Sequence, residues 1–97
     1  MTSNHKLTGL LKGRRITSTS NSGGVMTIGF DDGSVMTVQT GDTGSNSALS
    51  GTVMTVQQEG TTMALGLEGG FTMTVPLAEE TSSVMVRDKH HAMEYAD

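Results

Sequence analysis

Apolar and polar residues alternate along most of the chain from residue 14 to residue 77. In the second part of this stretch, apolar side chains recur at every second position in three runs: Met54 and Val56; Met63, Leu65 and Leu67; Phe71, Met73 and Val75. A period of two is typical of antiparallel strands that bury one face and expose the other. The pattern therefore predicts a mainly β protein.

The alternating pattern occurs twice in the chain, and the two copies align at an offset of 37 residues without a gap. The identical pairs are glycines, methionines and strand-forming residues: Gly23/Gly60, Met26/Met63, Gly29/Gly66, Gly33/Gly70, Met36/Met73, Thr37/Thr74 and Val38/Val75. A repeat of this length usually marks one supersecondary unit that cannot bury its apolar face alone. We predict two tandem three-stranded antiparallel meanders, a pseudo-repeat in which each copy covers the other.

The expected organisation is a single domain that spans all 97 residues. Its segments, in chain order, are a short N-terminal helix or arm (1–13), the first meander (14–40), a linker loop (41–50), the second meander (51–77) and a C-terminal β-hairpin (84–97). The helix is indicated by the helical spacing of Leu7, Leu10 and Leu11, which precede Gly13. The strands are expected to form a small sandwich or a partly open barrel.

The turns follow from the requirement that apolar residues stay on one face of each hairpin. The turns of the two meanders are predicted at 31–33, 59–60 and 68–70. They would pair Ile28 with Met36, Val56 with Met63, and Leu65 with Met73, respectively. Gly33 and Gly70 are the structural turn residues, and both are expected to have positive φ.

The C-terminal segment predicts one more hairpin, with a turn centred on residues 89–90 that pairs Val86 with Met93. Met85 would then point outward, away from the apolar face of this hairpin. We therefore regard Met85 as a candidate contact residue. Most of the other methionines fall on the predicted apolar face, where they are expected to fill the core rather than to bind a soft metal.

Composition limits both the core and the chemistry. Apolar residues make up 34% of the chain and only three residues are aromatic, so the core must be thin and a partner subunit could complete it. The chain contains no cysteine, which excludes disulfides, thiolate zinc sites and a thiol nucleophile. We find neither a signal-peptide pattern nor an apolar run of membrane-spanning length, and expect a cytoplasmic protein without membrane contact.

Charge is distributed unevenly. Residues 1–15 contain four basic residues and no acid, whereas all ten acidic residues follow. Lys12, Arg14 and Arg15 in this basic arm are candidate contact residues. We do not expect nucleic acid as the partner, because the acidic body would repel phosphate. A basic arm of this kind more commonly caps its own helix or pairs with its own acidic body.

The histidines and carboxylates do not form a recognisable catalytic or metal-binding motif. His90 and His91 are adjacent, and adjacent strand residues point to opposite faces, so they are poorly placed to chelate one ion. An enzyme or metal site would require one of them to fold back against Glu79, Glu80 or Asp88. We expect no catalytic residue, cofactor or metal.

The function expected from these observations is a non-catalytic interaction or regulatory module that self-associates, most simply as a dimer, or binds another protein. Exposed strand edges and the thin core favour this interpretation. One alternative is a carrier for a small apolar ligand, held between the sheets in a cavity lined by Met54, Met63, Met73 and Phe71. The other is the enzyme or metal site at His90 and His91.

Overall fold

The structure is a computed structural model that describes residues 2–40, 51–79 and 83–96. Its elements are β1 (Thr2–Ser3), α1 (His5–Leu11), β2 (Arg15–Ser22), β3 (Val25–Phe30), β4 (Val35–Gln39), β5 (Gly51–Glu59), β6 (Thr62–Leu67), β7 (Phe71–Pro76), β8 (Val84–Arg87) and β9 (Met93–Ala96). The strands form one antiparallel sheet in the order β7-β6-β5-β2-β3-β4-β8-β9, with β1 paired to β5. The mainly β fold class with one short helix is confirmed.

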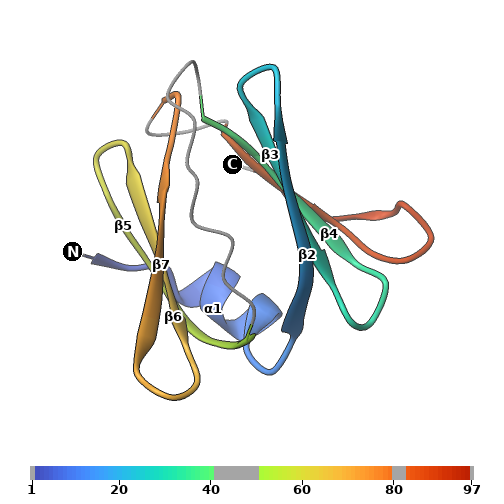
Figure 1. Ribbon diagram of the computed structural model, residues 1–97, viewed down its shortest axis with the longest axis horizontal. Helices are drawn as coiled ribbons and strands as arrows, with labels where there is room; N and C mark the ends of the chain where they lie inside the picture. Colours follow the sequence, from blue (N-terminus) through green and yellow to red (C-terminus); the bar gives the residue numbers. More distant parts are fainter. Residues whose placement is uncertain (1, 41–50, 80–82, 97) are drawn as a thin grey trace.

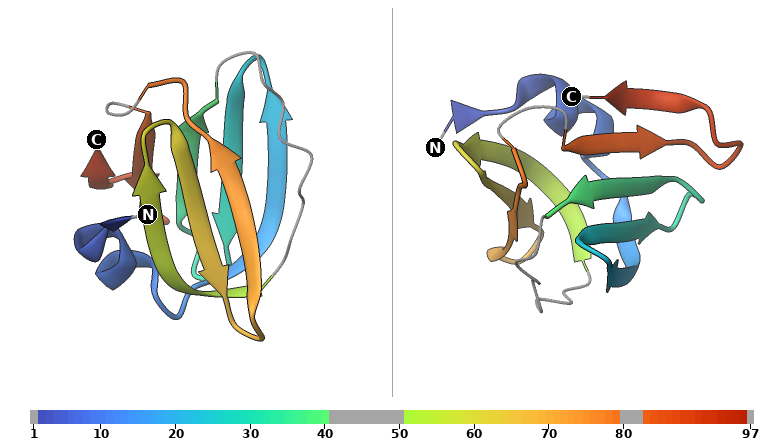
Figure 2. Two further views of the ribbon diagram at one scale, coloured as in Figure 1. Left: turned by 90° about the vertical axis from the view of Figure 1, so that its left-hand side faces the viewer. Right: turned by 90° about the horizontal axis from the view of Figure 1, so that it is seen from above.

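The sheet is bent into two halves that face each other (Figures 1 and 2). One half contains β5, β6 and β7, and the other contains β2, β3, β4, β8 and β9. The halves are joined where β2 pairs with β5 through two residue pairs only, Arg15 with Thr52 and Ile16 with Gly51. Because β7 and β9 stand at the two ends of the strand order, the sheet does not close into a barrel.

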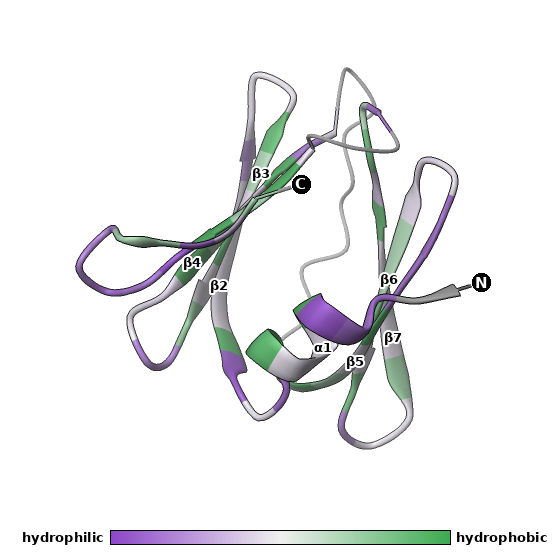
Figure 3. Cartoon of the chain, turned by 180° about the vertical axis from the view of Figure 1, so that it is seen from behind, coloured by the Kyte–Doolittle hydropathy of each residue, from purple (hydrophilic) through white to green (hydrophobic). Residues whose placement is uncertain are grey.

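The N-terminal helix lies between the two halves of the sheet (Figures 1 and 3). It begins after Asn4, whose side-chain oxygen accepts a hydrogen bond of 2.9 Å from the backbone N–H of Leu7. Its chain reverses at Gly13, which has a φ of 90°. Leu7 and Leu11 are fully buried, so α1 contributes its apolar side to the core.

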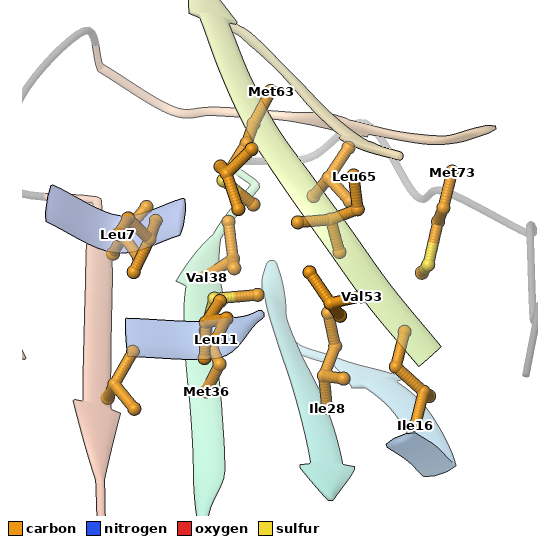
Figure 4. Close-up of a cluster of buried hydrophobic side chains, with 14 of the residues drawn as sticks. Leu7, Leu11, Ile16, Ile28, Met36, Val38, Val53, Met63, Leu65 and Met73 are labelled. Atoms are coloured by element: carbon orange, nitrogen blue, oxygen red, sulfur yellow. The ribbon is translucent and has the colours of Figure 1, made fainter. Parts of the chain in front are cut away.

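The core is formed by inward-facing side chains from both halves of the sheet and from α1 (Figure 4). Met36, Met63 and Met73 have no exposed surface and pack among leucine, isoleucine and valine side chains. These methionines therefore fill the core, where their flexible side chains suit irregular gaps. The ends of the β3–β4 and β8–β9 hairpins, which project from the sheet, are hydrophilic (Figure 3).

The pairing around the two three-residue turns matches the expected register. Ile28 lies opposite Met36, and 37 positions later Leu65 lies opposite Met73. Gly33 and Gly70 have φ values of 87° and 84°, in the left-handed region that disfavours a side chain. Periodicity and glycine placement together thus determine these two turns.

The expected register of the β5–β6 hairpin is wrong by two residues. Val56 lies opposite Leu65 rather than Met63, and the turn lies at residues 60–61. A bulge between Val53 and Thr55 also shifts the pairing further along β5, where it places Val53 in the core and turns Met54 outward with 39% of its surface exposed.

The equivalent bulge occurs in β2, between Ile16 and Ser18. Each bulge lies opposite a glycine of the neighbouring strand, Gly29 in β3 and Gly66 in β6. A Cβ atom on Gly29 would lie 2.5 Å from the hydroxyl oxygen of Ser18, so that side chain would have to move. The glycines leave room for the hydroxyl side chains that the bulges bring close.

The expected pairing of the C-terminal hairpin is also wrong. Val86 lies opposite Tyr95, and Met93 lies opposite Arg87 with 53% of its surface exposed. The additional residue that shifts the register is Glu94, whose side chain forms an ion pair with an arginine of the N-terminal segment. Phe71, expected on the buried face, is 63% exposed at the start of the edge strand β7.

Candidate functional site

Two hollows on the surface are candidates for a functional site. The larger, which we call the outer groove, has a volume of about 620 Å³ and is lined by Val25, Thr37, Gln39, Ser83, Val84, Met85 and Ala96. The smaller, which we call the Arg14 pocket, has a volume of about 270 Å³ and is lined by Arg14, Asp32, Ser34, Asp88, Lys89, His90 and Glu94. They differ in chemistry, because the first contains no charged side chain and the second contains six titratable ones.

The outer groove is the solvent-facing side of four neighbouring strands. Thr37 of β4 lies opposite Met85 of β8, which in turn lies opposite Ala96 of β9. Their strand neighbours Val38, Val84 and Val86 are buried in the core. Because side chains alternate between the two faces of a strand, Thr37, Met85 and Ala96 share the outer face.

Met85 therefore lies where the sequence placed it, on the outer face, and it is half-buried there. Val25 adds an apolar side chain at the start of β3, with 37% of its surface exposed. The contributions of Val25 and Ala96 to this face were not predicted from the sequence. No sequence pattern near Val25 or Ala96 indicates this position, because the order of the strands in the sheet is what brings them next to Met85.

The Arg14 pocket is organised by one guanidinium group that bridges three segments. Both terminal nitrogens of Arg14 donate to the carboxylate of Glu94, each at 3.0 Å. One of them also donates to the hydroxyl of Ser34 at 2.9 Å, and Nε lies 3.3 Å from a carboxylate oxygen of Asp32. This bidentate arrangement is among the stronger ion-pair geometries in proteins.

The electrostatics of the pocket follow from these bonds. The hydrogen bond with Glu94 raises the pKa of Arg14 above its ordinary value. A hydrogen bond from the hydroxyl of Ser34 lowers the pKa of Asp32, and the backbone N–H groups of Ala92 and His90 lower the pKa of Asp88. Arg14, Asp32 and Asp88 are therefore charged at neutral pH and already hydrogen-bonded within the protein.

Of the other residues singled out in the sequence, Asp88 and His90 line the Arg14 pocket. Lys12 and Arg15 are exposed at the surface. His90 and His91 are exposed in the turn between β8 and β9, and His91 has a φ of 65°. Glu79 ends the second described range, and Glu80 lies outside the described residues.

Residue types alone could not have revealed the Arg14 pocket. Arg14 and Glu94 are 80 positions apart, and the fold brings them together by placing β9 beside the N-terminal segment. Tyr95 takes part in the same junction, because its hydroxyl accepts a hydrogen bond of 3.1 Å from Asn4 and its ring centre lies 5.9 Å from the ammonium nitrogen of Lys6.

Among the described residues, no group of three or more His, Cys, Asp or Glu side chains is placed to hold a metal ion. Within the same ranges, no helix has the length and apolar character needed to cross a membrane. Comparisons with family models, curated proteins and solved structures found no match to this chain.

Proposed function

We propose that this protein is a non-catalytic interaction module that self-associates through the outer groove. The observation that carries the proposal is the neutrality of the groove, whose seven lining residues are uncharged in a chain with six basic and ten acidic residues. In a symmetric dimer the same patch is used by both copies, so a charged patch would bring like charges together. A neutral patch avoids that repulsion.

The apolar side chains of the outer face supply the attraction for such a contact. Val25 and Met85 present flexible or branched apolar groups at the groove, and Ala96 leaves space beside Met85. Met93, which is 53% exposed, lies on the same side of the sheet outside the groove lining, opposite the charged Arg87. Burial of apolar surface contributes about 25 cal/mol per Å² to association before the entropic cost of binding is subtracted.

Sedimentation velocity over a wide range of protein concentrations tests the proposal. We expect the wild-type protein to shift from monomer toward dimer as concentration rises, and the Met85→Lys variant to dimerise markedly less at the same concentrations. The control is Met54→Lys, which places the same charge at an exposed methionine on the other half of the sheet, and should still dimerise. A wild-type protein that stays monomeric throughout, or a Met85→Lys variant that dimerises as strongly as the wild type, would refute the proposal.

A second candidate function is the binding of a small apolar ligand in the same groove. Its volume of about 620 Å³ is favourable, since small-molecule sites commonly measure about 300–1,000 Å³. The cavity expected between the sheets does not follow from the structure, because Met63 and Met73 are packed in the core while Met54 and Phe71 lie at the surface. Saturable binding of an apolar fluorescent dye that Met85→Lys abolishes, in a protein that stays monomeric, would favour this function.

A further inference from the structure

Strand β9 is held to the rest of the molecule without a fully buried side chain. Its four residues are exposed or half-buried, whereas Val84 and Val86 of the neighbouring strand β8 are buried in the core. Tyr95 is the β9 residue that packs partly against the core. Removing β9 would therefore expose little apolar surface compared with removing any inner strand.

Specific polar contacts hold β9 in addition to its pairing with β8. Glu94 forms the bidentate ion pair with Arg14, and Tyr95 meets Asn4 through its hydroxyl and Lys6 through its ring. These contacts require a carboxylate followed directly by a tyrosine on an extended segment. The site that receives β9 is thus selective for the sequence of β9 itself.

The connection between β8 and β9 is short and carries an unfavourable backbone conformation. The loop spans residues 88–92, and His91 has a φ of 65°, which is uncommon for a residue with a side chain. The carboxylate of Asp88 accepts hydrogen bonds from the backbone N–H groups of His90 and Ala92, which keeps the loop closed. An extended loop would relieve the conformation of His91, and short strained loops favour exchange of the strand that follows them.

From these three observations we infer that β9 exchanges between two copies of this chain, so that the β9 of each copy completes the sheet of the other. The occupant of the β9 position is then the same sequence, with the Arg14–Glu94 ion pair formed between copies. Closed and exchanged forms share the β8–β9 pairing and differ mainly in the loop, so protein concentration and loop conformation set the balance between them.

The exchange rests on the proposed self-association and gives it a second route, through an interface other than the outer groove. The two are connected by Ala96, which belongs to β9 and also lines the outer groove. In an exchanged dimer, each groove would receive this residue from the partner copy. The Met85→Lys substitution should abolish the contact through the groove and leave the exchange of β9 intact, so either proposal can fail alone.

A disulfide reporter can distinguish closed from exchanged molecules, because the chain contains no cysteine of its own. Arg87 and Met93 lie opposite each other, and the adjoining bond of 2.9 Å from the N–H of Asp88 to the carbonyl of Ala92 makes them a non-hydrogen-bonded pair. The Cα atoms of such a pair are about 4.5 Å apart, within disulfide range. The double variant Arg87→Cys/Met93→Cys therefore links β8 to whichever β9 is paired with it.

The experiment mixes isotope-labelled and unlabelled double variant in the Met85→Lys background, equilibrates the mixture at low and high protein concentration, oxidises it and maps the disulfides by mass spectrometry. We expect 87–93 links between labelled and unlabelled chains, in a fraction that rises with concentration. Links within single chains at every concentration would overturn the inference. So would links between chains that join only 87 to 87 or 93 to 93, because these report surface contact without exchange.

Two loop variants in the same assay test the role of the loop. His91→Gly removes the penalty of a positive φ and should reduce the exchanged fraction by about fivefold or more. Deleting His90 and His91 should prevent the chain from folding back and give exchanged dimers at low concentration. An exchanged fraction that neither change alters would contradict the inference, and circular dichroism establishes that each variant is folded.

Discussion

Replacing Gly33 and Gly70 by alanine, one at a time, separates the cost of backbone conformation from the cost of crowding. The two glycines occupy equivalent turns and have nearly the same φ, 87° and 84°. Their surroundings differ. A Cβ atom on Gly33 would lie 2.8 Å from the Cβ of Lys89 in the β8–β9 loop, whereas a Cβ atom on Gly70 would have no neighbour within 4 Å.

The expected magnitudes follow from this difference. Gly70→Ala should lower the free energy of unfolding by about 1 kcal/mol, the usual cost of a left-handed conformation for a residue with a side chain. Gly33→Ala should lower it by about 2–3 kcal/mol, because the new methyl group must also displace the backbone-proximal carbon of Lys89. The excess reports how closely the β3–β4 turn is packed against the β8–β9 loop.

Urea denaturation followed by circular dichroism measures both values, provided the slope of each transition stays at its wild-type value. Lys89→Gly in the Gly33→Ala background is the rescue variant, since it removes the Cβ that causes the crowding. We expect this variant to recover the stability that Gly33→Ala loses beyond Gly70→Ala. The loss that is due to the left-handed backbone conformation should remain. Equal losses for the two alanine variants would refute the reasoning, as would a larger loss for Gly70→Ala.

Three further predictions concern the ion pairs and the core. A double-mutant cycle of Arg14→Leu and Glu94→Gln should give a coupling energy of about 1–2 kcal/mol in urea denaturation, since the pair is bidentate and mostly shielded from solvent; a value near zero would contradict this. Ser34 lowers the pKa of Asp32, so the stability that this carboxylate contributes above its ordinary pKa should be lost as pH falls through its folded value. Denaturation at a series of pH values should show that decline below about pH 4, and Asp32→Asn should make it shallower. Met73→Ala should cost about 2–5 kcal/mol because the side chain is fully buried, and thermal melting with little change would exclude the core assignment.

Periodicity predicted the fold class and the three-residue turns because both depend on which face a residue occupies. A register shift of one residue would have moved Ile28 or Met36 to the solvent-exposed face. Only registers that keep both side chains on the buried face were therefore acceptable. The positions of Gly33 and Gly70 then selected the turn length. Local sequence carries all of this information.

The same criterion could not fix the β5–β6 hairpin. Val56 can face Met63 or Leu65 with every apolar side chain still directed inward, because registers that differ by two residues keep the same face. A bulge adds a further residue that alternation cannot anticipate, as at Met54 and again at Glu94. Long-range contacts decide such cases, and the contact of Glu94 with Arg14 is the clearest example.

The location of the charged groups bears directly on the kind of function the molecule can perform. Arg14, Asp32 and Glu94 are engaged with one another, and Asp88 is engaged with its own loop. A reaction that used them would first have to break bonds that hold the β9 strand and two turns together. The side chains that line the outer groove are uncharged and take part in no ion pair. They belong to β3, β4, β8 and β9 and to Ser83, which directly precedes β8. Because Ala96 belongs both to this groove and to the strand that the ion pair secures, displacement of β9 would alter the groove itself. In this chain, therefore, the charged residues hold β9 and its neighbouring turns in place, and in the proposed function the uncharged residues of the outer groove provide the contacts.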